Sequence, residues 1–264
     1  MKSSHSTEAS VIARARLAFD RAAASYDAAA EFQRRICDRL VGLLPGDLDP
    51  LRVADLGCGT GYSTRHLASR FVRAEILGID FAPSMLQQAR GDGGARYWIG
   101  ADIQSLPLRP ESVDLACSSL ALQWCDPAQA FCEAMRILRP GALLAIATVG
   151  PGTLVELESA FAGVDGHDHV MQFCDAARLA ALAEAAGLRV AHALAEPLTL
   201  YRPDLHSILR ELKAIGANTV GSRRRRGMLS RAGWQAVERR YESLRGAAGL
   251  PVTYSALYLL ATRP

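Results

Sequence analysis

The sequence predicts an α/β fold in which helices cover both faces of a mostly parallel sheet. Short apolar segments alternate with segments of helical length between residues 51 and 149, a rhythm typical of doubly wound sheets. A glycine-rich stretch, VADLGCGTG (53–61), links the first apolar segment to a helical one. Half of the 264 residues are hydrophobic and 22% are charged, as expected for a globular domain and not for a disordered chain.

The individual elements follow in chain order. A helical stretch is expected over residues 10–44, where Ile36, Leu40 and Leu43 recur at three- and four-residue spacing. PGDLDP (45–50) is a loop of helix breakers, and five strands with intervening helices follow up to Val149. Beyond it we expect a Gly/His-rich loop (150–171), a helix (175–186), a strand (188–200), two helical stretches (203–217, 229–245) and a last strand (252–263).

These elements predict one domain of 264 residues with five segments. The region between the last two strands is too short and too closely flanked to be independent, so we interpret it as a helical insertion or lid. The segments are an N-terminal helical cap (1–48), a core (49–150), a loop, helix and sixth strand (151–200), the insertion (201–250) and the last strand (251–264).

Charge and cysteine spacing limit the class of protein. The formal net charge is only +3, so an anionic partner would need a local basic patch. Six cysteines without a C-x-x-C pair predict reduced thiols in the cytoplasm. The N-terminus has no continuous apolar signal region, and no apolar run approaches the roughly 20 residues that span a bilayer. A soluble protein is expected; oligomeric state leaves no signal, and a monomer is slightly favoured.

The glycine loop indicates a ligand without phosphate. Gly57, Gly59 and Gly61 allow positive φ and close approach to a ligand. The spacing is D-x-G-x-G-x-G, however, and not the G-x-G-x-x-G of dinucleotide sites. Asp55, two residues before the first glycine, would repel a pyrophosphate and suits a cation. S-adenosylmethionine, with its ammonium and sulfonium groups, fits this pattern; a purely structural turn is the alternative.

Acidic residues also follow the next two strands. Asp80 ends ILGID, 19 residues after Gly61, where a carboxylate can accept hydrogen bonds from ribose hydroxyls. Asp102 follows the third strand and suits the exocyclic amine of adenine, with Ile103 against the ring. Met85 could pack on adenine or simply in the core. Three acids after three consecutive strands, in this order, favour one common ligand.

These residues resemble the class I S-adenosylmethionine-dependent methyltransferases. The similarity covers the D-x-G-x-G-x-G loop, the acidic end of strand two, A-D-x-x-x-L-P, SSLALQW (118–124) and ILRPGALLAIAT (137–148). The resemblance implies a Rossmann-like, seven-stranded sheet with an antiparallel last strand. It also implies that Phe81, Ser119 and Leu120 contact the cofactor, whose product is S-adenosylhomocysteine.

The methyl acceptor is expected to be a carboxylate. Phenol, amine and carbon acceptors need a positioned base, whereas a carboxylate is already an anion at neutral pH. No convincing base is present: His66 falls on the helix after the glycine loop, and His167 and His169 belong to a loop. An H-x-H pair alone is a weak metal signal, so no metal is expected.

Longer segments resemble one group of methyltransferases, the malonyl-acyl-carrier-protein O-methyltransferases of biotin synthesis. They are FDRAAASYDAAAEFQRR (19–35), SSLALQWCDP (118–127), LKAIGAN (212–218) and LPVTYSALYLLATR (250–263). The resemblance implies methylation of the free carboxylate of a malonyl thioester, on a carrier protein or on coenzyme A, which primes pimeloyl formation. Methyltransferases of quinone biosynthesis and of small carboxylic acids are the alternatives.

The same resemblance assigns residues to the acceptor. Tyr26 is expected to be catalytic and Gln33 to bind the cofactor, because they match positions that close over both substrates; core packing is the alternative for Tyr26. One departure is Met171, where many members of the family carry asparagine. A substrate role of that loop position is therefore in doubt.

The run of four arginines at 223–226 is the remaining feature. If the acceptor is carried by an acidic protein, Arg223, Arg224, Arg225 and Arg226 are expected to dock it, helped by Arg210, Lys213 and Arg231. Arg210 and Lys213 lie one helical turn apart and could instead clamp the malonyl carboxylate. A solvated loop is the alternative. A nucleic-acid surface is not expected, because no aromatic residues are interleaved with the arginines.

Overall fold

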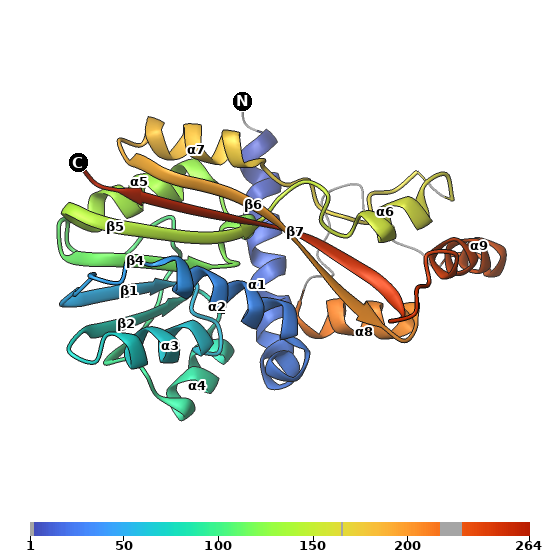
Figure 1. Ribbon diagram of the computed structural model, residues 1–264, viewed down its shortest axis with the longest axis horizontal. Coiled ribbons are helices and arrows are strands. Elements are labelled where there is room, and N and C mark those ends of the chain that lie inside the picture. Colours follow the sequence, from blue (N-terminus) through green and yellow to red (C-terminus); the bar gives the residue numbers. More distant parts are fainter. Residues whose placement is uncertain (1–2, 165, 217–228) are drawn as a thin grey trace.

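The structure is a computed structural model that describes residues 3–164, 166–216 and 229–264. Its centre is a seven-stranded sheet in the order β3-β2-β1-β4-β5-β7-β6 (Figure 1). Strand β7 pairs antiparallel with β5 and β6, and the other pairs are parallel. The predicted doubly wound, seven-stranded fold is confirmed. The strands are β1 (Arg52–Leu56), β2 (Glu75–Asp80), β3 (Tyr97–Gly100), β4 (Val113–Ser119), β5 (Leu138–Val149), β6 (Arg189–Arg202) and β7 (Leu250–Thr262).

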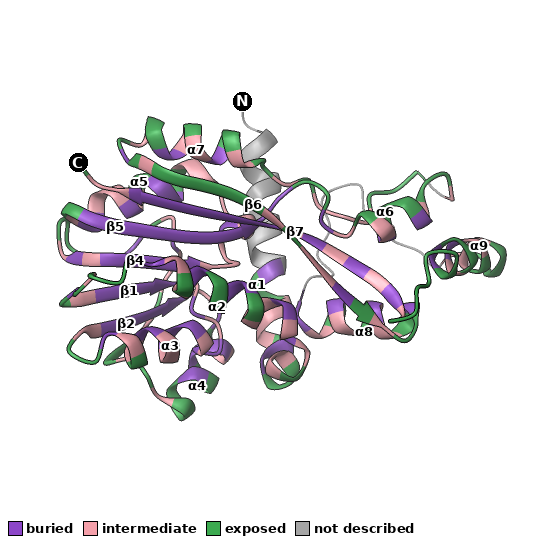
Figure 2. Ribbon diagram, viewed as in Figure 1, coloured by how far each residue is buried: buried purple, intermediate pink, exposed green. Residues whose placement is uncertain are grey.

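The central strands are buried on both faces, as their continuous apolar sequences require (Figure 2). On β5, Leu143 and Ala145 belong to one core cluster and Leu144 and Ile146 to the other, because successive side chains point to opposite faces. The first cluster includes residues of α2 (Glu31–Leu43) and α3 (Tyr62–Arg70). The second includes residues of α5 (Pro127–Ile137) and α7 (Ala176–Ala185). Helix α4 (Pro83–Asp92) packs on β2 and β3.

The N-terminal segment forms two helices and not the single stretch suggested by residues 10–44. Helix α1 (Ser3–Ala29) ends before Ala30, whose φ of −89° and ψ of 33° interrupt the helix, and α2 follows at once. The break lets the two helices serve different purposes. Helix α2 packs on the sheet near β4 and β5, whereas α1 contacts α4, α8 (Leu205–Ala214) and the short 3-10 helix η1 (Leu122–Trp124).

Strands β6 and β7 continue beyond the rest of the sheet as a two-stranded ribbon (Figure 1). Helix α8 and α9 (Arg231–Glu242) lie at its far end, in the predicted insertion. Side chains of Asp204 and Ser230 cap these helices by accepting from the amides of Ser207 and Gly233. Residues 201–202 belong to β6 and residue 250 to β7, although they were expected to belong to the insertion.

One helix was missed by the sequence analysis. Residues 150–171 were expected to form a loop, but α6 (Val155–Phe161) occupies part of that region. The carboxylate of Glu156 accepts from the amide of Thr253 on β7 at 3.1 Å, which ties α6 to the ribbon. Within the part of the chain that the structure describes, none of the helices combines the length and the apolar character that a membrane crossing requires.

Candidate active site

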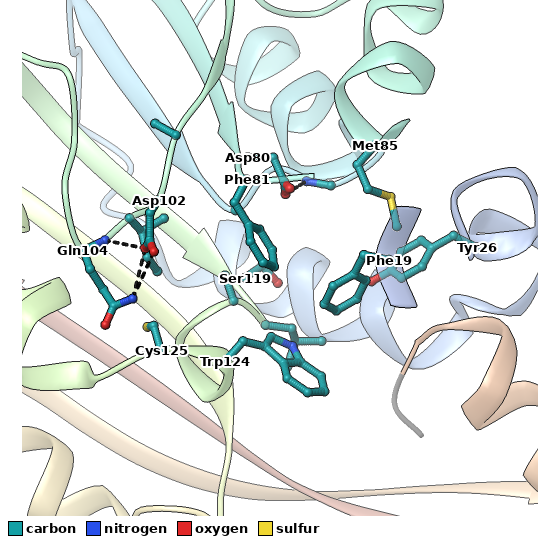
Figure 3. Close-up of a pocket in the computed structure, with 16 residues that line it drawn as sticks. Phe19, Tyr26, Asp80, Phe81, Met85, Asp102, Gln104, Ser119, Trp124 and Cys125 are labelled. Carbon is teal, nitrogen blue, oxygen red and sulfur yellow. Dashed lines mark hydrogen bonds between the residues drawn. The ribbon is translucent and has the colours of Figure 1, made fainter. Parts of the chain in front are cut away.

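A cavity of about 620 Å³, partly open to solvent, lies at the carboxyl ends of β1, β2 and β4 (Figure 3). We call it the strand-end cavity. Its position follows from the topology: β1 lies between β2 and β4, so the connections from neighbouring strands leave in opposite directions and open a crevice there. Nine of the residues predicted to bind a cofactor line it: Gly57, Gly59, Asp80, Phe81, Met85, Asp102, Ile103, Ser119 and Leu120.

The glycine loop forms one wall of the strand-end cavity. Gly57 and Gly59 have φ values of 74° and 53°, which favour glycine. A Cβ added to Gly57 would lie 2.2 Å from the Cβ of Ala121, so a side chain there would collide with the opposite wall. The amide of Gly57 donates to the carbonyl of Ile79 at 2.8 Å, which holds the loop against the end of β2. A side chain at position 57 would therefore clash with the protein itself, so the loop can follow this path only with glycine there.

Asp80 is the buried carboxylate of this wall. It is 5% exposed and accepts hydrogen bonds from the amides of Gly59 and Ala82, at 2.9 and 2.8 Å. Burial raises the pKa of Asp80 to about 6, although both amide hydrogen bonds oppose that shift. A ligand that brings hydroxyl groups or positive charge to Asp80 would therefore favour its ionised form.

Asp55 does not reach the strand-end cavity, which corrects the expectation that it binds the cation directly. It is fully buried below the glycine loop, and its two oxygens accept from the hydroxyls of Thr64 and Ser63 at 2.6 and 3.1 Å. These hydroxyls belong to the first turn of α3, so Asp55 anchors the helix that follows the loop. Burial raises the pKa of Asp55 to about 6, and the nearby charge of Asp80 adds to the shift. Gly61, at the start of α3, likewise lies outside the cavity lining.

Asp102 lies at the other end of the strand-end cavity and is held by Gln104. The carboxylate accepts from the Gln104 backbone amide at 2.9 Å and from its Nε2 at 3.1 Å. Gln104 is in turn oriented by the amide of Asp126, which donates to its Oε1 at 3.0 Å. Asp102 is therefore fixed in direction, with its oxygens already engaged. Ile103, 9% exposed, supplies apolar surface beside it, whereas Met85, 2% exposed, lies near Phe19 and Tyr26 (Figure 3).

A second cavity, of about 690 Å³ and also partly open, adjoins the first. We call it the helical cavity, because α1, α2 and α8 each contribute to its lining. Phe32 of α2 stacks on Tyr254 of β7 with ring centroids 3.7 Å apart. Leu212 and Ile215, at the end of α8, complete this apolar surface. Residues separated by more than 200 positions in the chain thus meet in one cavity.

The two cavities meet at four shared residues. Phe19, Tyr26, Leu120 and Trp124 line both of them. The Phe19 ring contacts Trp124 and Tyr26 edge-on, with centroids 5.4 and 6.4 Å apart, and these rings face the space beside Phe81 in Figure 3. We call this group the shared wall. These side chains therefore lie between a ligand group in one cavity and a ligand group in the other.

Backbone strain marks the shared wall and its surroundings. Leu120 has a φ of 59°, in a region that side chains rarely occupy, and it sits directly after β4. Leu154, which lines the helical cavity, has a φ of 58°. Such residues cost of order 1–3 kcal/mol each and cluster at functional sites. No sequence pattern announces them, because leucine has no preference for this conformation.

Tyr26 places its ring at the shared wall, as expected for a residue near both substrates. Burial raises the pKa of the Tyr26 phenol, and the charges of Asp80 and Asp27 raise it further. The hydroxyl therefore stays protonated at neutral pH and can only donate a hydrogen bond to an anion. Gln33 lies in the helical cavity and in a smaller cleft beside Gly59, but not in the strand-end cavity. Its Oε1 is buried and has no hydrogen-bond partner among the residues that the structure describes.

The loop after α6 closes one side of the helical cavity. His169 lines the cavity and stacks on Phe161 at 3.8 Å between ring centroids. Met171, the departure from the family pattern, lines the same cavity with an apolar side chain. Among the described residues there is no group of three or more His, Cys, Asp or Glu side chains that could hold a metal ion.

The basic residues that were predicted to bind the acceptor or its carrier protein either lie outside both cavities or do not belong to the described residues. Arg210 and Lys213 are exposed on α8, and neither lines the helical cavity, which corrects the idea that they clamp a carboxylate there. Their surface position still allows contact with a macromolecule. Arg223, Arg224, Arg225 and Arg226 lie outside the described residues, so their predicted docking role remains a prediction.

Several cavity residues were not selected from the sequence. Phe19 and Trp124 lie inside segments that carried the family resemblance, so their position in those segments was the available signal. Gln104 and Cys125 also lie in such segments, A-D-x-x-x-L-P and SSLALQWCDP, but only the fold shows that they lie beside Asp102. The residues of the strand-end cavity that were missed are Phe19, Ala101, Gln104, Ala121, Trp124 and Cys125.

Comparison with solved structures shows the fold. A chain of the complex between the Haloferax volcanii Trm112 methyltransferase activator and a methyltransferase aligns with a TM-score of 0.58 at 21% identity, covering 94% of this chain and 97% of that one. An S-adenosylmethionine-dependent methyltransferase from Thermotoga maritima aligns with a TM-score of 0.56 at 17% identity, covering 95% and 100%. Residues 54–146, which include the glycine loop and Asp80, match the family described as "Methyltransferase domain".

Closer relatives extend over nearly the whole chain. A malonyl-acyl-carrier-protein O-methyltransferase from Dechloromonas aromatica is 44% identical over 95% of this chain and 94% of its own length. One from Laribacter hongkongensis is 41% identical over 95% of this chain and 89% of its own. This similarity includes the helices and the ribbon that build the helical cavity as well as the glycine loop. The chain therefore belongs to the family of malonyl-acyl-carrier-protein O-methyltransferases.

Proposed function

We propose that the protein transfers a methyl group from S-adenosylmethionine to the free carboxylate of a malonyl thioester. The product is the malonyl methyl ester that primes pimeloyl formation in biotin synthesis. The observation that carries the proposal is the shared wall: Phe19, Tyr26, Leu120 and Trp124 border both cavities. A donor in the strand-end cavity and an acceptor in the helical cavity would thus face each other there. Family membership supports the choice of acceptor.

The donor fits the strand-end cavity by its chemistry. S-adenosylmethionine supplies an electrophilic methyl group on a positively charged sulfur. Asp80 is placed to accept hydrogen bonds from the ribose hydroxyls. Gly57 and Gly59 have no side chains, which leaves room beside them for the methionine part of the ligand. Asp102, with Ile103, would receive the adenine amine at the other end of the cavity. Asp55 acts indirectly, by anchoring the first turn of α3.

Methylation of a carboxylate does not require the protein to supply a general base. The acceptor is an anion at neutral pH, so the side chains need only align it and exclude water. Tyr26 supports this role because its phenol remains protonated and can donate to one carboxylate oxygen while the other attacks. The rings of Phe19 and Trp124 restrict the approach to the shared wall. Tyr26 is therefore proposed as a catalytic residue that orients the acceptor.

The thioester arm is proposed to lie in the helical cavity. Its lining is largely apolar and includes Phe32, Leu212, Ile215 and Tyr254, which suits an uncharged chain. Exposed Arg210 and Lys213 on α8 lie beyond this lining, on the surface where an acidic carrier protein could bind. The cytoplasmic location inferred from the cysteines stays a prediction.

Product identification tests the function directly. The protein is incubated with methyl-labelled S-adenosylmethionine and with malonyl-carrier protein, malonyl-coenzyme A or free malonate in separate reactions. We expect label on one or both thioesters, released by mild base as expected for a methyl ester, and little label on free malonate. Mass spectrometry locates the added methyl. Transfer to free malonate alone would favour a small-acid methyltransferase, and label on none of the three would contradict the proposal.

A further inference from the structure

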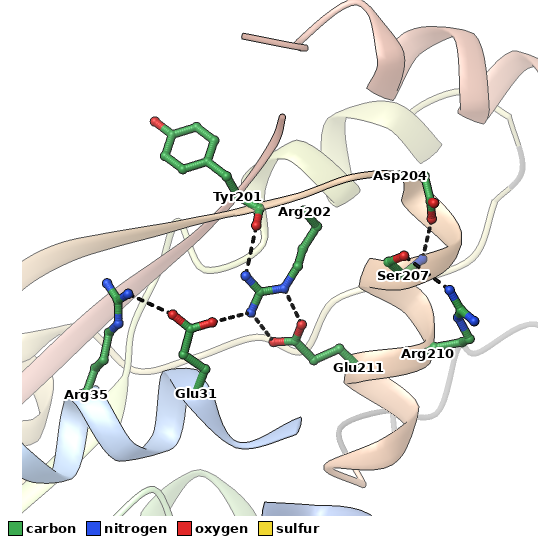
Figure 4. Close-up of polar contacts among 8 residues, drawn as sticks. All are labelled: Glu31, Arg35, Tyr201, Arg202, Asp204, Ser207, Arg210 and Glu211. Atoms are coloured by element: carbon green, nitrogen blue, oxygen red, sulfur yellow. Dashed lines mark hydrogen bonds and ion pairs between the residues drawn. The ribbon is translucent and has the colours of Figure 1, made fainter. Parts of the chain in front are cut away.

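Arg202, at the end of β6, is enclosed by acidic side chains from two helices (Figure 4). Its Nε donates to Oε2 of Glu211 on α8, and its Nη2 lies 2.8 Å from Oε1 of the same carboxylate. The same Nη2 lies 3.1 Å from Oε2 of Glu31, the first residue of α2. The Arg202 and Glu211 side chains are each 16% exposed. One guanidinium thus joins β6, α8 and α2.

The neighbours of these two acids line the helical cavity. Phe32 and Gln33 follow Glu31 on α2, and Leu212 follows Glu211 on α8. Each helix therefore presents cavity-lining side chains within two positions of a carboxylate that Arg202 holds. A change in the separation of the two carboxylates would move these walls of the cavity.

We propose that Arg202 is a positioning residue for the methyl acceptor. Its guanidinium fixes α2 and α8 relative to each other where both border the helical cavity. The inference rests on the proposed function, in which that cavity holds the malonyl thioester. Arg202 is not part of the cavity lining and acts through Glu31 and Glu211.

The geometry requires a guanidinium and not merely a positive charge. Nε and Nη2 of Arg202 together hold the Glu211 carboxylate, while Nη1 donates to the carbonyl of Tyr201 at 2.9 Å. The planar fork has enough donors to hold Glu211, Glu31 and this carbonyl at once, whereas a lysine ammonium is a point charge on a flexible stem. Arg202→Lys therefore keeps a positive charge between the two acids and removes the fixed geometry. Removing the charge entirely would leave the largely buried Glu211 carboxylate without its cationic partner, whereas Glu31, 41% exposed, keeps its ion pair with Arg35 at 2.7 Å.

The chain offers a matched control in Arg39. Its Nε and Nη2 lie 3.0 and 2.6 Å from the two carboxylate oxygens of Glu196. This pair also joins α2 to β6, but its side chains are 47% and 39% exposed and neither lines the helical cavity. Arg39→Lys thus makes the same chemical change at an ion pair that joins α2 to β6, away from the acceptor.

The test measures acceptor kinetics and donor binding separately. For the wild type and both variants, kcat and KM for malonyl-carrier protein are measured at saturating S-adenosylmethionine, and the donor Kd is measured by calorimetry. We expect Arg202→Lys to raise the acceptor KM about tenfold, because small misplacements of a binding wall have large effects. The donor Kd should stay within about twofold, and Arg39→Lys should change neither quantity by more than about twofold.

Hydrogen exchange provides a second readout that needs no substrate. Amides of α8 (205–214) should exchange faster in Arg202→Lys and at the wild-type rate in Arg39→Lys. The proposal is overturned if the acceptor KM of Arg202→Lys is unchanged, if Arg39→Lys raises it equally, or if donor affinity falls as much as acceptor affinity. A wild type that leaves malonyl thioesters unmethylated would instead contradict the proposed function. In that case unchanged exchange in α8 would still refute the tie between the helices.

Discussion

The strand-end cavity and the helical cavity lie side by side, but the chain builds them differently. In the first, Asp80 and the glycine loop are fixed by backbone hydrogen bonds at the ends of adjacent strands. In the second, Phe32, Leu212 and Tyr254 come from α2, α8 and β7 and meet through side-chain packing. Local backbone geometry thus shapes one cavity, and contacts between distant segments shape the other.

This difference suggests a division of labour. A cavity made by strand ends keeps its shape as long as the sheet is intact, and it suits a ligand that is the same in every reaction. A cavity made by helices and an insertion can be altered without disturbing the sheet, and it suits a ligand that differs between enzymes. The following variants test this division, beginning with the largest expected effect.

Asp80→Ala should weaken S-adenosylmethionine binding about a hundredfold, because it removes a buried acceptor and frees the amides of Gly59 and Ala82. Calorimetry with the donor measures the loss. Asp102→Ala is the comparison variant and should cost only about tenfold, since its oxygens are already engaged by Gln104. Donor binding by Asp80→Ala at wild-type affinity would show that the strand-end cavity is not the donor site.

Tyr26→Phe should lower kcat about thirtyfold, because the acceptor carboxylate loses a hydrogen bond made by a neutral donor. The donor Kd should remain within about twofold, since the ring at the shared wall is retained. Single-turnover kinetics and calorimetry separate the two quantities. Equal losses of turnover and donor affinity would indicate that Tyr26 mainly supports the fold.

The raised pKa of Asp55 should make the free energy of unfolding depend on pH. Its pKa is raised from 3.8 to about 6 by burial, so the folded state binds a proton more tightly than the unfolded state. Its contribution is therefore favourable at low pH and is lost as the pH rises through about 6. Relative to Asp55→Asn, the wild type should gain about 2 kcal/mol in free energy of unfolding between about pH 7.5 and 4.5.

Urea unfolding of both proteins at the two pH values measures this gain. The comparison with Asp55→Asn cancels the titration of other groups, such as Glu133 and Glu196, whose pKa values are lowered by their arginine partners. A difference between the two proteins that does not change with pH would mean that the Asp55 carboxyl has an ordinary pKa in the folded state.

Charge reversal on α8 should give the smallest effect. Arg210→Glu with Lys213→Glu should lower kcat/KM for malonyl-carrier protein about fivefold and affect malonyl-coenzyme A, a smaller anion, less, because rim charges mainly affect encounter with a macromolecule. The difference should shrink in high salt. Arg178→Glu, which reverses an exposed charge on α7, is the control. Equal loss with both thioesters would exclude a docking role for these two residues.

The sequence predicted the strand-end cavity better than the helical one for a physical reason. Glycine spacing and acids after strands are local patterns, and parallel strands place their carboxyl ends at one edge whatever the loops do. Asp80 and Asp102 therefore lie where they were expected. Asp55 was misplaced because a pattern gives a residue's position along a strand, but not whether the hydroxyls of Ser63 and Thr64 take up its oxygens.

The helical cavity could be predicted only from the resemblance to a known family. Its lining residues are far apart in the chain and apolar, so nothing distinguishes Leu212 or Phe32 from an ordinary core residue. Helix α6 was missed because its seven residues lie in a region rich in glycine and histidine. The ion pairs of Arg202 with Glu31 and Glu211 could not be predicted from local patterns either, because 171 positions separate Glu31 from Arg202.

The ribbon of β6 and β7 has a consequence for how such enzymes diversify. Residues 256–262 of β7 pair with both β5 and β6, whereas residues 250–255 pair, within the described part of the chain, with Pro197–Arg202 of β6 alone. Arg202 pairs with Leu250 at the end of this ribbon, so the segment between the strands (203–249) begins and ends at neighbouring positions. Exchange of that segment between relatives should transplant the preference for one methyl acceptor over another while the donor site is inherited unchanged.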